Sequence, residues 1–97
     1  MLVILVTIYV DWTALSISVV IPAYNAADTI GKCLDSVASQ LEVPFEVIVV
    51  DDNSSDDTVA VAIKSGAQVV RCEEISGTAV ARNRGAGVAG GDVLLFL

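Results

Sequence analysis

Three short groups of polar residues in this sequence follow or adjoin apolar runs, and each could contribute to a ligand site. In the first, Pro22-Ala23-Tyr24-Asn25, an aromatic ring could stack on a planar base and an amide could hydrogen-bond to it. A tyrosine in such a place often has a purely structural role, with its hydroxyl in water. The group therefore suggests base recognition without establishing it.

The second group is the pair of adjacent carboxylates Asp51 and Asp52, which follow the apolar run 45–50. Because side chains alternate along an extended segment, these two should point to different sides. One could face a ligand and accept a hydrogen bond from a ring or ribose donor, while the other braces a loop. Alternatively, both solvate the turn and cap the next helix. The residues alone leave the two interpretations equally open.

The third group is Ala81-Arg82-Asn83-Arg84, in a segment whose other residues are mostly small. Small residues let a helix pack closely, and an arginine held there could direct its planar guanidinium at a diphosphate. Either arginine could instead be an ordinary solvated helix residue. We favour Arg82 for ligand contact and the solvated interpretation for Arg84.

A glycine pattern, formed by Gly85, Gly87 and Gly90, matches the G-x-G-x-x-G of dinucleotide-binding proteins. In those proteins the pattern follows a strand and opens a helix, whereas here it ends a helical segment and precedes an apolar run. We therefore do not interpret it as a dinucleotide site.

Residues 47–53 look like the first strand and acidic pair of a response-regulator receiver domain. Such a domain needs a phosphoacceptor aspartate at the end of a later strand and a lysine beyond it. Lys64 is the only lysine after Asn53, and it comes too early in the chain. A receiver domain is therefore disfavoured.

Composition restricts the class of partner. The chain has 97 residues, of which 55% are apolar, so it can form the core of one domain. Its formal charge of -7, from 12 acidic and 5 basic residues, provides no basic face for nucleic acid. An anionic small ligand would need a well-placed arginine or a bound cation to offset this acidic field.

Neither the cysteines nor the apolar start of the chain indicates a further function. Cys33 and Cys72 lack the spacing of a zinc pair, and we expect both to be small buried hydrophobes. The apolar run 1–10 is too short to span a bilayer and has no basic start like that of a signal peptide. We treat residues 1–15 as a lead-in of unknown role, with the remnant of a longer membrane segment as an alternative.

The elements that must position these residues alternate along residues 16–97 in the order β-α-β-α-β-α-β. We predict strands over residues 18–21, 45–50, 68–71 and 92–97. We predict helices over residues 58–64 and 78–88, and an earlier helix with the apolar face Ile30, Leu34, Val37 and Leu41. The run 45–50 does not alternate, which indicates burial on both sides and a central place in the sheet.

Local signals predict where some elements begin and end. Pro22 should halt the first strand, and Asn25 with Asp28 should form a capping box on the first helix. One of the serines in 54–55 should cap the helix over 58–64. Alternation of this kind favours a parallel sheet with right-handed crossovers, in which ligands bind at the carboxyl ends of the strands.

Taken together, the motifs resemble the start of family 2 glycosyltransferases in content, order and spacing, over about residues 16–97. The matching segments are Ser18-Val19-Val20-Ile21-Pro22-Ala23-Tyr24-Asn25, Glu46-Val47-Ile48-Val49-Val50-Asp51-Asp52-Asn53-Ser54-Ser55-Asp56, Gly77 with Ala81-Arg82-Asn83-x-Gly85, and Gly91-Asp92-Val93-Leu94-Leu95-Phe96-Leu97. The resemblance implies the nucleotide-sugar-binding part of an α/β fold of the GT-A type, with a Rossmann-like, mostly parallel sheet that is incomplete here.

The same resemblance implies roles for individual residues in nucleotide binding. Tyr24 would lie against the base, usually uracil, and Asp52 would accept a hydrogen bond from the base ring nitrogen. The turn at Pro22 and Ala23, together with Asn25, would line the pocket. Arg82 would lie near the nucleotide or its diphosphate. Many relatives have glutamate at Ala26 and glycine at Asn53, and asparagine tolerates the left-handed backbone that glycine would supply.

By the same resemblance, an Asp-x-Asp motif that binds Mg2+ or Mn2+ is expected just after Leu97. We therefore assign no metal ligand and no catalytic residue to this chain, and we expect a truncated domain that is inactive alone. The implied donor is a UDP-sugar, the implied transfer to an acceptor hydroxyl is inverting, and the expected location is cytoplasmic, with membrane association open for a longer protein. The alternative is a non-catalytic interaction module, in which a partner or a second copy completes the sheet beside the exposed strand near Leu97.

Overall fold

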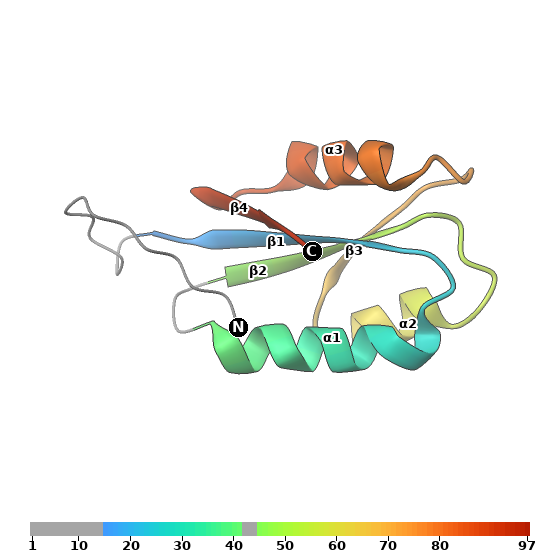
Figure 1. Cartoon of the computed structure of the whole chain (residues 1–97), viewed down its shortest axis with the longest axis horizontal. Helices are drawn as coiled ribbons and strands as arrows, with labels where there is room; N and C mark the ends of the chain where they lie inside the picture. Colours follow the sequence, from blue (N-terminus) through green and yellow to red (C-terminus); the bar gives the residue numbers. More distant parts are fainter. Residues whose placement is uncertain (1–14, 42–44) are drawn as a thin grey trace.

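A computed structural model describes residues 15–41 and 45–97 of the chain. These residues form an α/β fold with one four-stranded sheet (Figure 1). In chain order the elements are β1 (Ile17–Ala23), α1 (Ala27–Gln40), β2 (Phe45–Asp51), α2 (Thr58–Lys64), β3 (Gln68–Arg71), α3 (Thr78–Val88) and β4 (Val93–Phe96). The predicted order of strands and helices is therefore confirmed.

The sheet has the strand order β3-β2-β1-β4, and all three strand pairs are parallel. β2 lies between two neighbours, as its continuous apolar run predicted, and β1 is an interior strand as well. Ala23 pairs with Asp51 where β1 and β2 finish. Parallel pairing thus brings the residues that follow these two strands to the same edge of the sheet.

The sheet is covered on both faces, by α1 and α2 on one side and by α3 on the other (Figure 1). Side chains alternate between the two faces along each strand. One hydrophobic cluster is made of the buried residues Ile17, Val19, Ile21, Ala23, Ile30, Leu34, Val37, Val49 and Ala62. The other is made of Val20, Ile48, Val50, Cys72 and Ala81. Each fully buried valine or isoleucine contributes about 1.5–3 kcal/mol through burial.

Helix α3 packs very closely on the sheet, as its small residues predicted. Gly85 is buried, and a Cβ atom built there would lie 2.3 Å from Val20 Cγ1 and 3.0 Å from Val50 Cγ2. Only glycine therefore fits between the helix and the two interior strands. This approach brings the amino end of α3 over the ends of β1 and β2.

Two predictions about the first strand and helix are wrong. Pro22 does not halt β1, which continues to Ala23, with Pro22 paired to Val50. Asn25 does not cap α1, because the N-cap residue is Ala26 and it makes no side-chain capping bond. The Asn25 backbone is left-handed (φ 48°), and its side chain is used by another loop. The capping box with Asp28 is therefore absent.

The predicted serine cap on α2 is also wrong. The N-cap residue of α2 is Asp57, and Asp56 accepts the N–H of Thr58 in place of a serine. The end of the helix is as predicted, since Gly66 follows it with a positive φ of 89°.

Within the described ranges 15–41 and 45–97, no helix is long and apolar enough to cross a membrane. Nearly all of the predicted lead-in, residues 1–14, lies outside these ranges. The interpretation of that segment stays a prediction.

Candidate functional site

The carboxyl edge of the sheet holds a small hollow between the end of β1, the end of β2 and the start of α3. Its volume is about 90 Å³, and it is lined by Pro22, Ala23, Tyr24, Asp52, Thr78 and Ala81. Four of the six predicted site residues thus come together from two strand ends. Larger hollows near Phe45 lie at the amino edge, away from the strand ends where parallel sheets bind ligands.

Asp52 is the charged residue in the lining of this hollow, and its side chain is held in place by the segment before α3. The residue is 7% exposed. Its Oδ1 atom accepts hydrogen bonds from the Ser76 N–H at 2.8 Å and the Ser76 hydroxyl at 2.9 Å, and Oδ2 accepts the Gly77 N–H at 3.0 Å. The Ser76 N–H is the largest of several causes that lower the pKa of Asp52. At neutral pH the group is therefore a carboxylate that only accepts hydrogen bonds.

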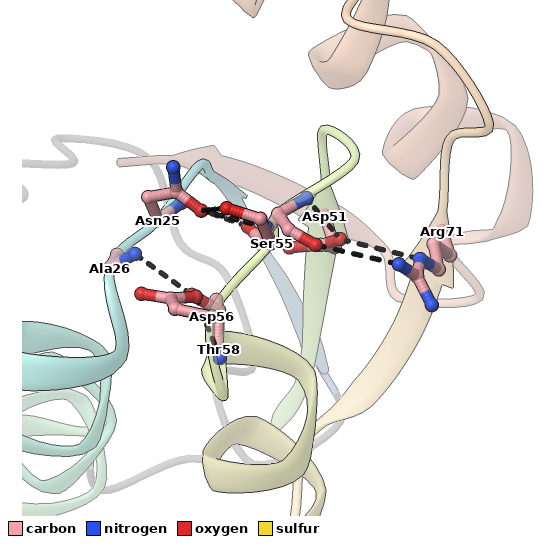
Figure 2. Close-up of polar contacts among 8 residues, drawn as sticks. Asn25, Ala26, Asp51, Ser55, Asp56, Thr58 and Arg71 are labelled. Atoms are coloured by element: carbon pink, nitrogen blue, oxygen red, sulfur yellow. Dashed lines mark hydrogen bonds and ion pairs between the residues drawn. The ribbon is translucent and has the colours of Figure 1, made fainter.

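Asp51, the other member of the pair, braces the following loop. It is fully buried, and its Oδ2 atom accepts the Ser54 N–H at 3.0 Å and lies 3.8 Å from Arg71 Nε (Figure 2). Arg71 also donates to the Ser54 carbonyl at 3.4 Å. The Arg71 side chain is 60% exposed, so this long ion pair contributes little to stability. The structure thus places the two carboxylates in different roles, with Asp52 at the hollow and Asp51 in the loop.

Asn25 does not line the hollow, because it joins the loops that follow β1 and β2. Its N–H donates to the Ser54 hydroxyl at 2.8 Å, and its Oδ1 atom accepts the Ser55 N–H at 2.8 Å (Figure 2). The left-handed backbone of Asn25 turns the chain between β1 and α1. Its geometry supports a structural role in placing Tyr24, which is 52% exposed at the hollow.

Asp56 joins the amino ends of two helices, a role that the sequence analysis missed. Its Oδ2 atom accepts the Ala27 N–H of α1 at 3.1 Å. Its Oδ1 atom accepts the Thr58 N–H of α2 at 3.0 Å and the Thr58 hydroxyl (Figure 2). The Thr58 hydroxyl in turn accepts the Ala26 N–H at 2.8 Å. These bonds, chiefly the one from the Thr58 hydroxyl, lower the pKa of Asp56. A carboxylate at helix amino ends also interacts favourably with both helix dipoles.

The two arginines of α3 are both exposed, and they lie differently relative to the hollows. Arg82 is exposed and lines neither the hollow at Asp52 nor its neighbour. Arg84 lines a second hollow of about 390 Å³ with Arg71, Glu73 and Glu74, and its charge contributes to the lowered pKa of Asp52. Arg84 is therefore the arginine whose field reaches Asp52, and ligand contact by Arg82 stays a prediction.

The residues that the structure describes do not form a metal site. No group of three carboxylate, cysteine or histidine side chains in ranges 15–41 and 45–97 could hold an ion. Asp52 and Asp56 are already occupied by N–H and hydroxyl donors, which compete with a cation for their oxygen atoms.

The sequence of this chain is similar to those of known glycosyltransferases. Residues 18–97 match the family model described as glycosyl transferase family 2. The chain is 40% identical over 96 residues to the amylovoran biosynthesis glycosyltransferase AmsB of Erwinia amylovora, covering 86% of this chain and 30% of that protein. It is 38% identical over 88 residues to the glycosyltransferase AglE of Haloferax volcanii, covering 84% of this chain and 29% of that protein.

Solved structures show the same fold. The glucosyl-3-phosphoglycerate synthase of Mycobacterium tuberculosis, solved with Mn2+, uridine diphosphate and glucosyl-3-phosphoglycerate, is 36% identical with a TM-score of 0.76. The match covers 87% of this chain and 33% of that one. The mannosyltransferase PcManGT of Pyrobaculum calidifontis, solved with GDP-Man and Mn2+, is 30% identical with a TM-score of 0.74, covering 80% of this chain and 25% of that one.

The chain thus spans a quarter to a third of the length of these four relatives. Its sheet is the α/β sheet of their GT-A fold, as the sequence predicted. The family model reaches from β1 to the last residue, and so includes every residue that lines the hollow at Asp52. The chain belongs to glycosyl transferase family 2.

Proposed function

We propose that this chain is the nucleotide-binding part of a glycosyltransferase that transfers a sugar from a UDP-sugar to an acceptor hydroxyl, with inversion. The observation that supports this most directly is the hollow at the carboxyl edge, where the Tyr24 ring and the Asp52 carboxylate meet. A relative with 36% identity over the same fold was solved with uridine diphosphate.

In this proposal Tyr24 and Asp52 recognise the base. The half-exposed Tyr24 ring offers an apolar face for stacking. Asp52 is ionised at neutral pH and accepts hydrogen bonds, so it favours a base with a ring N–H in that position. Uracil and guanine have such an N–H, whereas cytosine has an acceptor nitrogen there. The neighbours solved with UDP and with GDP-Man fit this preference.

The diphosphate would lie beyond the base, over the exposed surface of α3 that carries Arg82. An arginine there offers a planar fork that matches two phosphate oxygens. We propose that the Mg2+ or Mn2+ of the longer enzyme binds outside the described residues, since these form no metal site. No step of the reaction is therefore assigned to a metal here.

Isothermal calorimetry with UDP, with CDP as the comparison, tests base recognition. The chain should bind UDP and discriminate against CDP by at least about tenfold, the effect of one hydrogen bond to a charged group. Asp52→Asn should reduce the ratio of the affinities for UDP and CDP, and Tyr24→Ala should weaken the binding of both ligands. Asp35→Asn, at an exposed position of α1, is the matched control. Equal affinity for UDP and CDP would contradict the proposal.

Transfer itself is proposed for the longer enzyme and not for this chain. The chain spans a third or less of the relatives described above, and no catalytic base is assigned to its residues. We expect the chain to bind UDP-glucose without hydrolysing it or transferring its sugar. Chromatography of the released UDP measures both reactions. Turnover above the buffer rate would show that the chain supplies a catalytic group of its own.

A second candidate function, a non-catalytic interaction module, is favoured by one observation. β4 pairs with β1 on one side, and Leu94, Phe96 and Leu97 are each more than 40% exposed. An apolar strand at a sheet edge can pair with another strand. Light scattering over a range of concentrations tests this, since a monomer at high concentration would count against self-association through β4.

A further inference from the structure

The segment just before α3 is attached to the rest of the fold through Asp52. Ile75, in the middle of residues 73–77, is 63% exposed. Among the described hydrogen bonds, the ones that join this segment to the sheet run from Ser76 and Gly77 to the Asp52 carboxylate. The contact orients both partners, because each restricts the movement of the other.

Glycine makes this geometry possible. Gly77 has φ 86° and ψ 164°, a backbone conformation that other residues rarely adopt. With this backbone, the consecutive N–H groups of Ser76 and Gly77 point at one carboxylate, an arrangement known to bind anions. Open space surrounds the position of a Cβ atom at Gly77, so backbone conformation, and not crowding, requires glycine here.

The three donors are divided unequally between the two oxygen atoms of Asp52. Each carboxylate oxygen has two lone pairs. Oδ1 accepts both the N–H and the hydroxyl of Ser76 and is therefore saturated, whereas Oδ2 accepts only the Gly77 N–H. Oδ2 retains the capacity to accept one more hydrogen bond.

We propose that Ser76 and Gly77 are positioning residues for Asp52, which saturate Oδ1 and leave Oδ2 as the single acceptor for a ring N–H of the nucleotide base. This inference rests on the proposed function for its ligand and adds two residues to the site. The Ser76 side chain contributes by its hydroxyl, and Gly77 contributes by its backbone.

The electrostatic surroundings of Asp52 allow this role to be measured. The titratable groups around Asp52 include the adjacent Asp51, Tyr24 at the same hollow, Arg84 on α3, whose charge acts on it, and Glu73 and Glu74, which line a hollow with Arg84. Removal of the Ser76 hydroxyl leaves these groups in place and removes one of the bonds that favour the ionised form. The pKa of Asp52 should therefore rise in Ser76→Ala.

The first experiment needs no ligand. The carboxyl carbon of Asp52 is followed by NMR against pH in the wild type, in Ser76→Ala and in Ser76→Thr, which retains a hydroxyl. Ser39→Ala, which removes a hydroxyl on the far helix α1, is the control. We expect a higher pKa in Ser76→Ala alone. If Ser76→Ala leaves the Asp52 titration unchanged, the inference is wrong, whether or not the chain binds nucleotide.

The second experiment measures UDP binding by the same variants against pH. Ser76→Ala should weaken UDP binding about tenfold at neutral pH. As the pH is lowered, it should begin to lose affinity for UDP at a higher pH than the wild type does. Ser76→Thr should restore both the affinity and the pH profile. Gly77→Ala should weaken UDP as well, and its NMR spectrum shows whether it folds. A wild type that does not bind UDP contradicts the proposed function. A wild type that binds, with an unchanged pH profile in Ser76→Ala, contradicts this inference alone.

Discussion

The fully buried hydroxyl of Ser18 donates a 2.7 Å hydrogen bond to Glu46 Oε1, across β1 and β2 near the amino edge of the sheet. The same hydroxyl accepts the Gly91 N–H at 2.8 Å, and Glu46 Oε1 accepts the Gly90 N–H at 2.8 Å. The turn between α3 and β4 is thereby attached to both interior strands. This attachment lies at the amino edge of the sheet, opposite the candidate site, and it holds the start of β4 beside β1.

Ser18→Ala should destabilise the chain by about 1–3 kcal/mol, because it leaves the part-buried Gly91 N–H without its acceptor. Urea unfolding followed by circular dichroism measures the change. Ser39→Ala, which removes an exposed hydroxyl on α1, should change stability much less. Equal effects of the two substitutions would mean that the Ser18 contact is not stabilising.

Gly85→Ala should destabilise the chain by about 1–3 kcal/mol, because the added methyl group would lie 2.3 Å from Val20 Cγ1. Gly87→Ala is a matched control on the same helix, with nothing within 4 Å of its Cβ position. That substitution should increase stability by about 0.5 kcal/mol, through helix propensity. Thermal unfolding of both variants measures the difference, and a Gly85→Ala variant as stable as Gly87→Ala would rule out the close packing.

Asp56→Asn should lower the melting temperature more than Asp57→Asn. Asp56 accepts an N–H group of α1 with one oxygen atom and an N–H group of α2 with the other, so an amide nitrogen in place of one oxygen, which cannot accept, removes one of these bonds. Asp57 is an exposed neighbour whose side chain makes no capping bond to α2. Differential scanning calorimetry compares the two variants. Melting temperatures that fall equally would show that charge, and not the two helix caps, is responsible.

Stability should decrease in acid. The pKa values of Asp52 and Asp56 lie below their ordinary value of 3.8, and that of Glu46 lies below 4.5, chiefly through the Gly90 N–H. The unfolded chain therefore binds protons at a higher pH than the folded chain does. The stabilisation is complete above about pH 5 and is lost as pH falls through the lowered values.

Urea midpoints between about pH 7 and about pH 3 test this acid dependence. The sequence contains no histidine, so no side chain with an ordinary pKa near 6.5 complicates the range. Asp52→Asn should show a smaller decrease than the wild type. A midpoint that is constant down to pH 3 would contradict the assigned hydrogen bonds.

The sequence predicted the elements correctly where the signal is local. The continuous apolar run of β2 predicted a central strand, and the small residues of α3 predicted close packing. The adjacent pair Asp51 and Asp52 predicted two directions for two carboxylates, which the structure shows. The sequence signal for each of these features lies within a few consecutive residues, although the contacts themselves join distant segments.

The sequence could not predict contacts that form between distant segments. The Ser55 partner of Asn25 lies 30 residues away, and the Ala27 partner of Asp56 lies 29 residues away. Local patterns therefore predicted that Asn25 caps α1. The side chain that accepts an N–H group at the start of α1 is instead that of Asp56, which does the same for α2. The role of Ser76 depends on Asp52, 24 residues earlier, and no motif marked it.

The parallel pairing of β1 with β2 has a consequence for folding kinetics. In a hairpin, strand pairing can begin next to the turn. Here the crossover that includes α1 must bring β1 and β2 together before any hydrogen bond between them forms. Since Ala23 and Asp52 reach the same edge only after that closure, the hollow cannot form before β1 and β2 have paired. A nucleotide would meet its site only on chains whose sheet has assembled, and its binding rate during refolding would report sheet formation.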